Sequence, residues 1–159
     1  MMTVSSDGSV IDFFEPETGF SDGEITALCE ECGVEDVLNG CRDGYGRIVA
    51  VARNDGRISG YACALYVGDS ADIGSICVAE PFRRRHIADV MLGGIIELLL
   101  KKKIVKVWLE VRESNAAARA LYSAHGFREA GTVRSYYRAP TENAVRMALD
   151  LGENEDTLV

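Results

Sequence analysis

The chain has 159 residues, of which 47% are hydrophobic and 26% are charged, and its formal net charge is −8. This length and composition predict one soluble globular domain with a single substantial core. No apolar run is long enough to span a membrane, and the first residues have neither a basic region nor an apolar core. We therefore expect no signal peptide and no membrane partner.

The negative charge is concentrated at the start of the chain. Residues 1–43 hold eleven acidic residues and one basic residue, a net charge of −10, which leaves +2 for residues 44–159. The later part is therefore mildly basic, which suits a polyanionic ligand. The acidic part is either a solvated face that aids solubility or a surface that attracts a basic partner.

The five cysteines are an odd number without the spacing of a disulfide framework. They predict reduced thiols in a cytoplasmic protein. Cys29-x-x-Cys32 could form half of a zinc site, but the sequence has no second such pair and only two histidines, His86 and His125. We interpret these cysteines as structural thiols on a helix and predict no metal.

The N-terminal part predicts one strand and two helices. Val10–Phe14 is a short apolar strand after a polar lead. The pattern Ser21-Asp22-Gly23-Glu24 predicts that Ser21 caps a helix, which then ends at Gly33. A second short helix is predicted over Val34–Cys41, before a turn at residues 43–46.

Three neighbouring strands follow. Ile48–Arg53 and Ile58–Val67 flank Asn54-Asp55-Gly56, a hairpin turn signal, and Asp72–Val78 is the third strand. Strands joined by such short turns form an antiparallel meander.

The second half alternates helices and strands. A helix begins near Ile87, and Val105–Val111 is a strand whose alternation places Glu110 and Trp108 on the face opposite its valines. Ser114 is the predicted cap of the next helix. The remaining elements are a helix from Asn115 to Ala124 and strands over Gly131–Tyr137 and Ala144–Leu149, around a loop at Arg138–Asn143. This order predicts an α/β fold with a mixed sheet and helices on its faces.

Three arginines stand between a strand and a helix. The apolar strand ends at Val78, Glu80-Pro81 makes a turn, and Arg83–Arg85 precede the helix at Ile87. Free backbone N–H groups and positive charge at a helix N-terminus bind phosphate. The alternatives are a solvated basic turn or a nucleic-acid patch, but three basic residues without interleaved aromatics do not favour nucleic acid.

The spacing Arg83-x-x-His86-x-Ala88 resembles the pyrophosphate-binding motif of the GNAT superfamily of acyl-CoA N-acetyltransferases, Gln/Arg-x-x-Gly-x-Gly/Ala, with His86 in place of glycine. Residues 108–149 resemble the second half of the GNAT core, and more narrowly the branch that acetylates ribosomal-protein alanine N-termini. The residues that carry this resemblance are Trp108-Leu109-Glu110-Val111-Arg112, Ser114-Asn115-x-x-Ala118, Leu121-Tyr122, His125-Gly126-Phe127, Arg134-x-Tyr136-Tyr137 and Glu142-Asn143-Ala144-x-x-Met147.

The resemblance implies one GNAT domain over residues 1–151, with a divergent helical part at 1–46, a core at 47–151 and a flexible acidic tail at 152–159. Its sheet would be mixed and mostly antiparallel, with helices on both faces and a splayed strand pair at the acyl-CoA site. The implied reaction is direct acetyl transfer from acetyl-CoA to a primary amine, first of all the N-terminal α-amino group of a protein such as a ribosomal protein.

Two other functions stay open on the same fold. One is an acetyltransferase for a small amine or amino acid. The other is an acyl-CoA-binding module with little turnover, because a side chain at His86 could crowd a phosphate that approaches the backbone. The oligomeric state is also left open.

The resemblance further implies which residues hold acetyl-CoA. Backbone groups of one strand would bind its arm, and the helix N-terminus with its arginines would bind its pyrophosphate. These residues are Ile76, Cys77, Val78, Arg83, Arg84, Arg85, His86, Ile87, Ala88 and Asp89, together with Asn115 and Tyr122.

Glu110 is the candidate general base. Its neighbours on the strand are apolar or aromatic, so partial desolvation should raise the pKa of its carboxyl group toward that of a useful base, the role that the family assigns at this position. The alternative is a structural ion pair with Arg112 or Lys106.

Two further assignments come from the resemblance. Tyr122 would protonate the departing thiolate of coenzyme A, and the alternative is a tyrosine that packs in the core. Tyr136 and Tyr137 would help to form the wall of the peptide site, and the alternative is that they cover the sheet edge.

Overall fold

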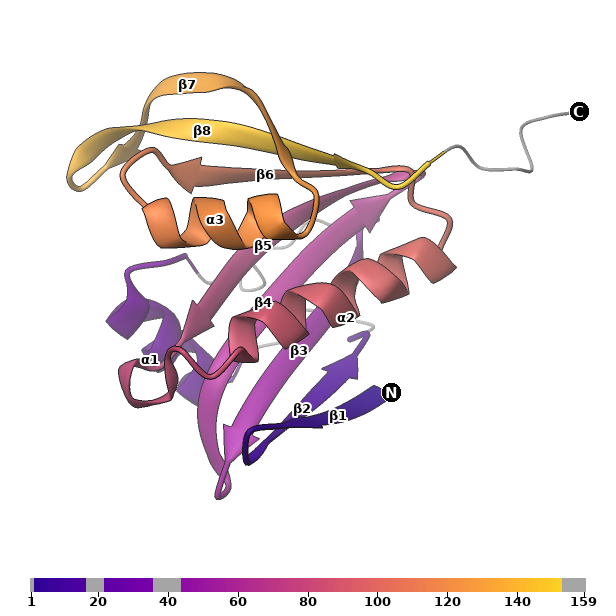
Figure 1. Ribbon diagram of the computed structural model, residues 1–159, viewed down its shortest axis with the longest axis vertical. Helices are drawn as coiled ribbons and strands as arrows, with labels where there is room; N and C mark the ends of the chain where they lie inside the picture. The colour runs from indigo at the N-terminus through magenta and orange to yellow at the C-terminus, as the bar shows by residue number, and fades with distance from the viewer. Residues whose placement is uncertain (1, 17–21, 36–43, 153–159) are drawn as a thin grey trace, which may run out of the picture.

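The computed structural model describes residues 2–16, 22–35 and 44–152. These residues form an eight-stranded sheet in the order β1-β2-β3-β4-β5-β6-β8-β7 (Figure 1). The strands are β1 Met2–Ser6, β2 Ser9–Phe14, β3 Gly46–Asn54, β4 Arg57–Val67, β5 Ser70–Val78, β6 Lys106–Arg112, β7 Arg128–Arg138 and β8 Thr141–Asp150. The helices are α1 Gly23–Cys32, α2 Ile87–Lys101 and α3 Ala116–Ala124. None of them is long and apolar enough to cross a membrane.

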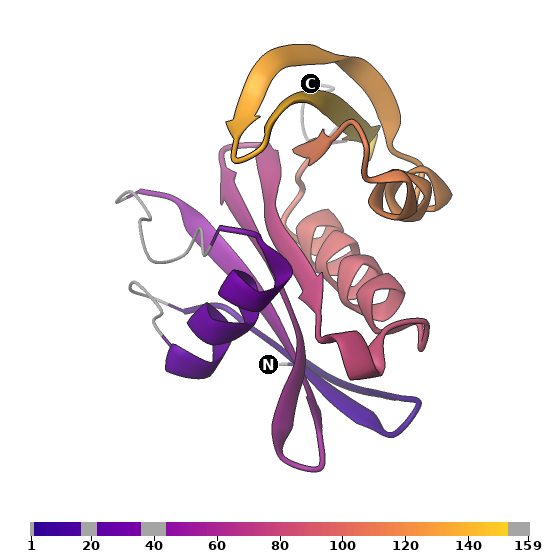
Figure 2. The same ribbon diagram turned by 90° about the vertical axis from the view of Figure 1, so that its left-hand side faces the viewer.

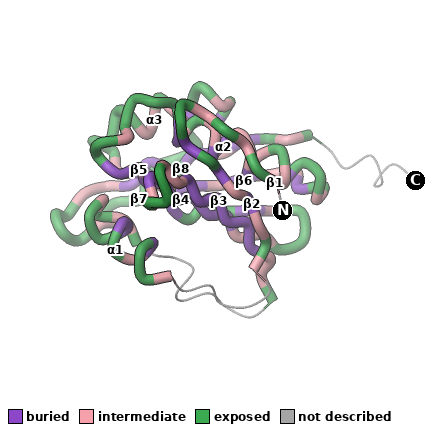
Figure 3. Tube along the Cα trace, turned by 90° about the horizontal axis from the view of Figure 1, so that it is seen from below, coloured by how far each residue is buried: buried purple, intermediate pink, exposed green. Residues whose placement is uncertain are grey.

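The helices cover both faces of the sheet. Figure 2 shows α1 on one side, and α2 and α3 on the other. One buried cluster joins α2 to alanines of β3 and β4, and a second joins α1 to Val49, Val51 and Tyr61. Buried residues therefore concentrate in the central strands (Figure 3). Among the described strands only β5 and β6 pair in parallel, so the predicted mixed, mostly antiparallel fold is confirmed.

The chain begins with a β-hairpin that the sequence analysis did not predict in full. The expected strand Val10–Phe14 is confirmed as β2, and β1 pairs with it in antiparallel. Their turn is Asp7-Gly8, with φ angles of 45° and 76°, which is typical of a turn that joins two strands directly. β1 was not predicted because it is short and mostly polar. Thr3 and Ser5 are its exposed residues, and few apolar residues lie on its other side.

The cap of α1 differs from the prediction by one residue. The Asp22 side chain accepts hydrogen bonds from the backbone N–H groups of Glu24, at 2.8 Å, and Ile25, at 3.4 Å. The prediction that Ser21 caps this helix is therefore wrong, because the aspartate carboxylate already takes both donors. Gly33 ends the helix at φ 68°, as predicted.

The last two strands are longer than predicted. The expected loop at Arg138–Asn143 is a tight turn at Ala139-Pro140, whose peptide bond is cis. The turn at Asp55-Gly56 between β3 and β4 is confirmed. The second short helix expected at Val34–Cys41 falls mostly outside the described residues.

Helix α2 approaches β2 closely at Gly94. A Cβ atom on Gly94 would lie 2.3 Å from the ring of Phe13, which is buried. A Cβ atom on the preceding Gly93 would meet only the His125 ring, at 3.6 Å, an ordinary contact. A side chain therefore fits at Gly93 but not at Gly94.

We predict that Gly94→Ala lowers the free energy of unfolding by about 1–3 kcal/mol, because it overpacks the core against Phe13. Gly93→Ala is the matched control and should raise this free energy by up to about 1 kcal/mol through helix propensity. Urea unfolding followed by circular dichroism measures both. Equal gains in the two variants would contradict the close packing of α2 on β2.

Candidate active site

The sheet opens between β5 and β6. These strands pair only at their beginnings, where residues Ser70–Asp72 face Lys106–Trp108. Beyond that point β5 stays paired with β4 as far as Val78, and β6 stays paired with β8 as far as Arg112. Figure 1 shows the two strands diverging. The expected splayed strand pair is confirmed, and the inner edge of β5 has no strand partner beyond Asp72 among the described residues.

A β-bulge lies in β5 just after the strands part. Cys63 of β4 pairs with Ser75 and the next residue pairs with Ile73, so Gly74 is left over. An extra residue reverses which side chains face which side of a sheet. Ile73 therefore packs in the cluster of α2, whereas Cys77 packs in the cluster of α1. The side chains of Ile76 and Val78 then face the same side as α2.

The N-terminus of α2 carries three exposed arginines. His86, directly before the helix, has a left-handed backbone with φ 59°, and its side chain makes no capping hydrogen bond. Arg83 Nε donates to the carbonyl oxygen of Val78 at 3.0 Å, and the Arg85 guanidinium lies 5.5 Å from the Phe82 ring centre. The Val78 carbonyl oxygen thus already accepts a hydrogen bond from within the chain. The uncapped first turn with its positive surroundings suits a pyrophosphate.

Asp89 in the first turn of α2 binds His125, which follows α3. Asp89 Oδ1 and His125 Nε2 are 2.7 Å apart. This contact joins the start of α2 to the end of α3, and the sequence analysis missed it because the two residues are far apart in the chain. Of the neighbouring residues, Ile87 is buried in the core and Ala88 is half-buried. The Asp89 carboxylate is therefore occupied, and its backbone N–H is the group left for a phosphate.

Glu110 lies on the face of β6 opposite Val107, Leu109 and Val111, as alternation predicts, which is the α1 side of the sheet. Its nearest cation is Arg146 of β8, with Nε 3.7 Å from Glu110 Oε1. The alternative partners Arg112 and Lys106 pair elsewhere, with Glu142 and Asp150. Cross-strand register, which places Arg146 directly opposite Glu110, decides the partner.

The carboxyl group of Glu110 is partly desolvated. Burial raises its pKa above the ordinary value, the Arg146 guanidinium opposes this increase, and the Asp72 carboxylate adds to it. The Glu110 side chain is 25% exposed. The net upward direction agrees with the expectation for a group that accepts a proton near neutrality.

Tyr122 lies on the opposite side of the sheet from Glu110. Its ring is buried in the cluster shared by α2 and α3 and meets Phe127 edge-on at 5.8 Å between centres. Burial, together with Tyr137, raises the pKa of Tyr122 to about 12. The phenol therefore stays protonated throughout the neutral range. A carboxylate and a phenol on opposite faces can reach one molecule only through the opening between β5 and β6.

Asn115 caps α3 in place of the predicted Ser114. Its side-chain oxygen accepts from the backbone N–H of Ala118 at 3.1 Å. The Ser114 N–H instead donates to Glu142 at 2.6 Å, which ties this loop to β8. The oxygen of Asn115 is thus used within its helix, and its amide NH₂ group is the part left for a ligand.

The two tyrosines of β7 lie beside this opening. Their ring centres are 5.0 Å apart, and Tyr136 is half exposed. Burial and Tyr136 raise the pKa of Tyr137 to about 12, with a smaller contribution from the Glu110 charge. Tyr137 in turn raises the pKa of Tyr122. Tyr137 is therefore the residue that is electrostatically linked to both candidate catalytic groups.

Arg112, at the end of β6, holds the turn between β7 and β8. Its guanidinium donates to Glu142, at 3.3 Å, and to the carbonyl oxygen of Pro140, at 3.1 Å. It also stacks 4.2 Å from the Tyr137 ring centre. This role of Arg112 depends on the tight turn between β7 and β8, where the sequence predicted a loop. The contact fixes the tyrosine pair relative to β6.

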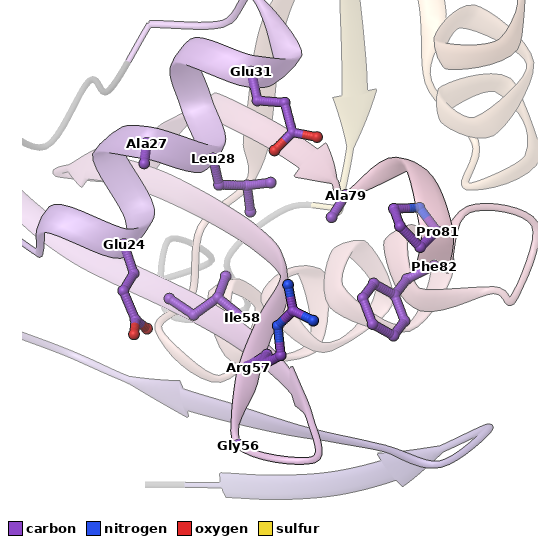
Figure 4. A pocket seen from close by; sticks show the side chains of 10 residues that line it. All are labelled: Glu24, Ala27, Leu28, Glu31, Gly56, Arg57, Ile58, Ala79, Pro81 and Phe82. Atoms are coloured by element: carbon purple, nitrogen blue, oxygen red, sulfur yellow. The ribbon is translucent and has the colours of Figure 1, made fainter.

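A separate cavity of about 360 Å³ lies on the α1 side (Figure 4). It is bounded by α1, the β3–β4 turn and the segment that follows β5. Its lining residues are Glu24, Ala27, Leu28, Glu31, Gly56, Arg57, Ile58, Ala79, Pro81 and Phe82. None of the predicted site residues is among them, so this cavity is distinct from the opening between β5 and β6.

A sheet that opens between two parallel strands, next to a helix N-terminus suited to a pyrophosphate, is the arrangement of the acyl-CoA-dependent N-acetyltransferases. The chain belongs to the acetyltransferase (GNAT) family, whose model matches residues 12–127. It is an N-acetyltransferase with acetyl-CoA as acetyl donor.

Known proteins resemble the chain at the levels of sequence and fold. A ribosomal protein bS18-alanine N-acetyltransferase from Salmonella typhimurium is 42% identical over 101 residues, which cover 61% of this chain and 67% of the relative. The crystal structure of the Escherichia coli ribosomal-protein alanine N-acetyltransferase has a TM-score of 0.73 and 27% identity, over 94% of this chain and 99% of that one. A GNAT acetyltransferase from Elizabethkingia anophelis with acetyl-CoA bound shares the fold, with a TM-score of 0.72 and 16% identity over 91% and 99% of the chains.

Proposed function

We propose that this enzyme acetylates the N-terminal α-amino group of a ribosomal protein that begins with alanine. The 42% identity to an enzyme named for that reaction is the observation that carries the proposal. The placement of Glu110 and Tyr122 on either side of the opening supports it. A ribosomal-protein substrate would place the enzyme in the cytoplasm. We further propose one catalytic domain over residues 1–151, in which a continuous sheet joins the N-terminal hairpin to the core.

Acetyl-CoA supplies an acetyl group activated as a thioester and a thiol leaving group. We assign its pyrophosphate to the uncapped N–H groups at the start of α2, with Arg84 and Arg85 as counter-charge. The free inner edge of β5 at Ile76–Val78 offers backbone groups for its arm, although the Val78 carbonyl is shared with Arg83. The amide NH₂ of Asn115 lies at the start of α3 as a further donor.

Glu110 would accept a proton from the substrate ammonium. An α-amino group has a pKa of roughly 8, against roughly 10.4 for lysine, so a carboxylate with a moderately raised pKa suffices for an N-terminus. Tyr136 and Tyr137 would form one wall of the peptide site, with Tyr136 exposed at its surface.

Tyr122 would donate its proton to the leaving sulfur. Its phenol, with a pKa of about 12, carries the proton at neutral pH. A thiol has a pKa of roughly 8.5, so transfer from this phenol is favourable only while negative charge develops on the sulfur at close range. Burial of the ring against Phe127 supports such a fixed position.

Binding of acetyl-CoA should depend on the N-terminus of α2. We predict that Arg84→Ala weakens binding and reduces its dependence on salt, because one cation near the phosphates is removed. His86→Gly should tighten binding, since glycine adopts φ 59° without strain and lets a phosphate approach the backbone. Isothermal titration calorimetry at two salt concentrations measures both.

The control for this binding prediction is Arg57→Ala, which removes an exposed arginine from the β3–β4 turn. Its affinity for acetyl-CoA should equal that of the unmodified protein. An equal loss in the Arg57 and Arg84 variants would mean that only overall charge matters and would contradict the assigned phosphate site.

Tyr122→Phe removes a proton donor and keeps the packing of the ring. We predict that kcat falls roughly a hundred- to a thousandfold, in the lower part of the range for positioned acids, with unchanged thermal stability. Tyr66→Phe, on a tyrosine that contacts Glu15 and Lys102 away from the opening, is the control. Undiminished turnover in the Tyr122 variant would leave this residue a purely structural role.

The substrate class can be tested with peptides and mass spectrometry. Incubation with acetyl-CoA should acetylate peptides that begin with alanine at their α-amino group, and leave the same peptides unmodified when that group is formylated. Spermine, free amino acids and lysine-containing formylated peptides serve as competing acceptors. Acetylation of these small amines in place of the peptides would refute the proposal, as would binding of acetyl-CoA without any product.

A further inference from the structure

Four side chains from three strands gather on the α1 face of the sheet, where β5 and β6 separate. Asp72 faces Trp108 in the parallel register, and Arg146 faces Glu110 in the antiparallel register. Directly opposed residues project to the same face of a sheet, as do residues two apart on one strand. Register alone therefore brings Asp72, Trp108, Glu110 and Arg146 onto one face.

Arg146 contacts two members of this group. Its Nε lies 3.7 Å from Glu110 Oε1, and its guanidinium carbon lies 4.6 Å from the centre of the Trp108 ring. A guanidinium that is stacked on an indole has a restricted orientation, because its flat face must follow the ring. The carboxylate of Glu110 thus meets a cation whose position is set by Trp108.

We propose that Arg146 is a positioning residue for the reaction: stacked on Trp108 and balanced by Asp72, it sets the position and charge of the Glu110 carboxylate. This inference rests on the proposed function, in which Glu110 accepts the proton. Neither Arg146 nor Asp72 stands out in the sequence, since each acquires its importance only from strand register.

The charges around Glu110 act in opposite directions. The Arg146 guanidinium lowers the pKa of both Glu110 and Asp72, whereas the Asp72 carboxylate raises the pKa of Glu110. Burial raises the pKa of both carboxyl groups and is the larger cause in each. Arg146 therefore keeps Glu110 ionised at a lower pH than burial alone would allow, and Asp72 limits this effect.

The other charged or titratable groups that face Glu110 are few in the described part of the chain. They are Lys106 of β6, which lies 4.9 Å from the Trp108 ring centre and pairs with Asp150, Arg112 of β6, which pairs with Glu142, and Tyr136 and Tyr137 of β7. The Glu35 carboxylate contributes through its effect on Tyr136. Substitutions at Arg146 and Asp72 leave all of these groups in the chain, so comparing the two variants separates the effects of the two removed charges.

Opposite shifts of one pH profile test the proposal. In Arg146→Gln, the acid limb of kcat/KM should move to higher pH, with a several-fold loss of rate on that limb, because Glu110 loses its nearest cation. In Asp72→Asn the same limb should move to lower pH. Arg146→Lys keeps the charge and should restore most of the profile of the unmodified enzyme. A loss of stability alone would not shift the acid limb in opposite directions in the Arg146→Gln and Asp72→Asn variants.

A second measurement reads the Glu110 carboxyl group without any turnover. Carbon-13 NMR of glutamate-labelled enzyme, with the Glu110 resonance identified by its loss in Glu110→Gln, follows its titration in each variant. Trp108 is the one tryptophan of the chain, so its emission shows whether the stacked site stays folded. Arg119→Gln is the control, since Arg119 binds Glu129 and its loss removes the same charge without facing Glu110.

The results separate this inference from the proposed function. Opposite shifts of the Glu110 titration in the Arg146 and Asp72 variants, matched by the pH–rate profiles, would support both. The same NMR shifts without matching changes in rate would support the action of Arg146 on Glu110 and refute Glu110 as the base. An unmoved Glu110 titration in Arg146→Gln, or a shift equal to that in Arg119→Gln, would overturn the inference.

Discussion

The early end of the pairing between β5 and β6 is the constraint on which the site depends. Each strand is held by its other neighbour, β5 by β4 and β6 by β8, so the two can part without loss of either. Among the described residues, backbone groups along the inner edges then have no strand partner, and such groups are satisfied by a hydrogen-bonding ligand or water. The bulge at Gly74 lies directly beyond the last parallel pair and turns the side chains of Ile76 and Val78 toward α2. This edge is the one to which the proposed function assigns the arm of acetyl-CoA.

In the proposed function Glu110 accepts a proton and Tyr122 donates one, and these two tasks require different environments on the two faces of the sheet. Glu110 must be ionised yet partly desolvated, and it shares its face of the sheet with Arg146 and Asp72, whose charges act on it in opposite directions. Tyr122 must keep its proton, and it lies in the apolar core between α2 and α3. The sheet itself separates these environments. An acceptor amine and an acyl donor could then approach from different faces and meet where the strands part.

Contacts between elements hold the edges of the opening in place. Arg112 ties the β7–β8 turn and Tyr137 to the end of β6, and Asp89 binds His125 to join α2 to α3. Arg83 reaches back to the last carbonyl of β5. These side chains are partly or fully exposed, so each contributes modestly to stability and mainly restricts geometry. The site is thus supported from the β7–β8 hairpin, from α3 and from the loop before α2.

Local patterns in the sequence determined most of the elements, because periodicity and turn chemistry act over a few residues. The alternation of β6 placed Glu110 on the correct face, and the arginines before Ile87 marked the helix N-terminus. Contacts between distant segments were decided only by the tertiary structure. The register of β8 on β6 chose Arg146 as the partner of Glu110, where sequence proximity had suggested Arg112 or Lys106. Likewise, Asn115 caps α3 while Ser114 binds Glu142 of β8. The partners of Glu110 and of Ser114 both come from β8, and strand register is a property of the packed sheet that a single stretch of sequence does not contain.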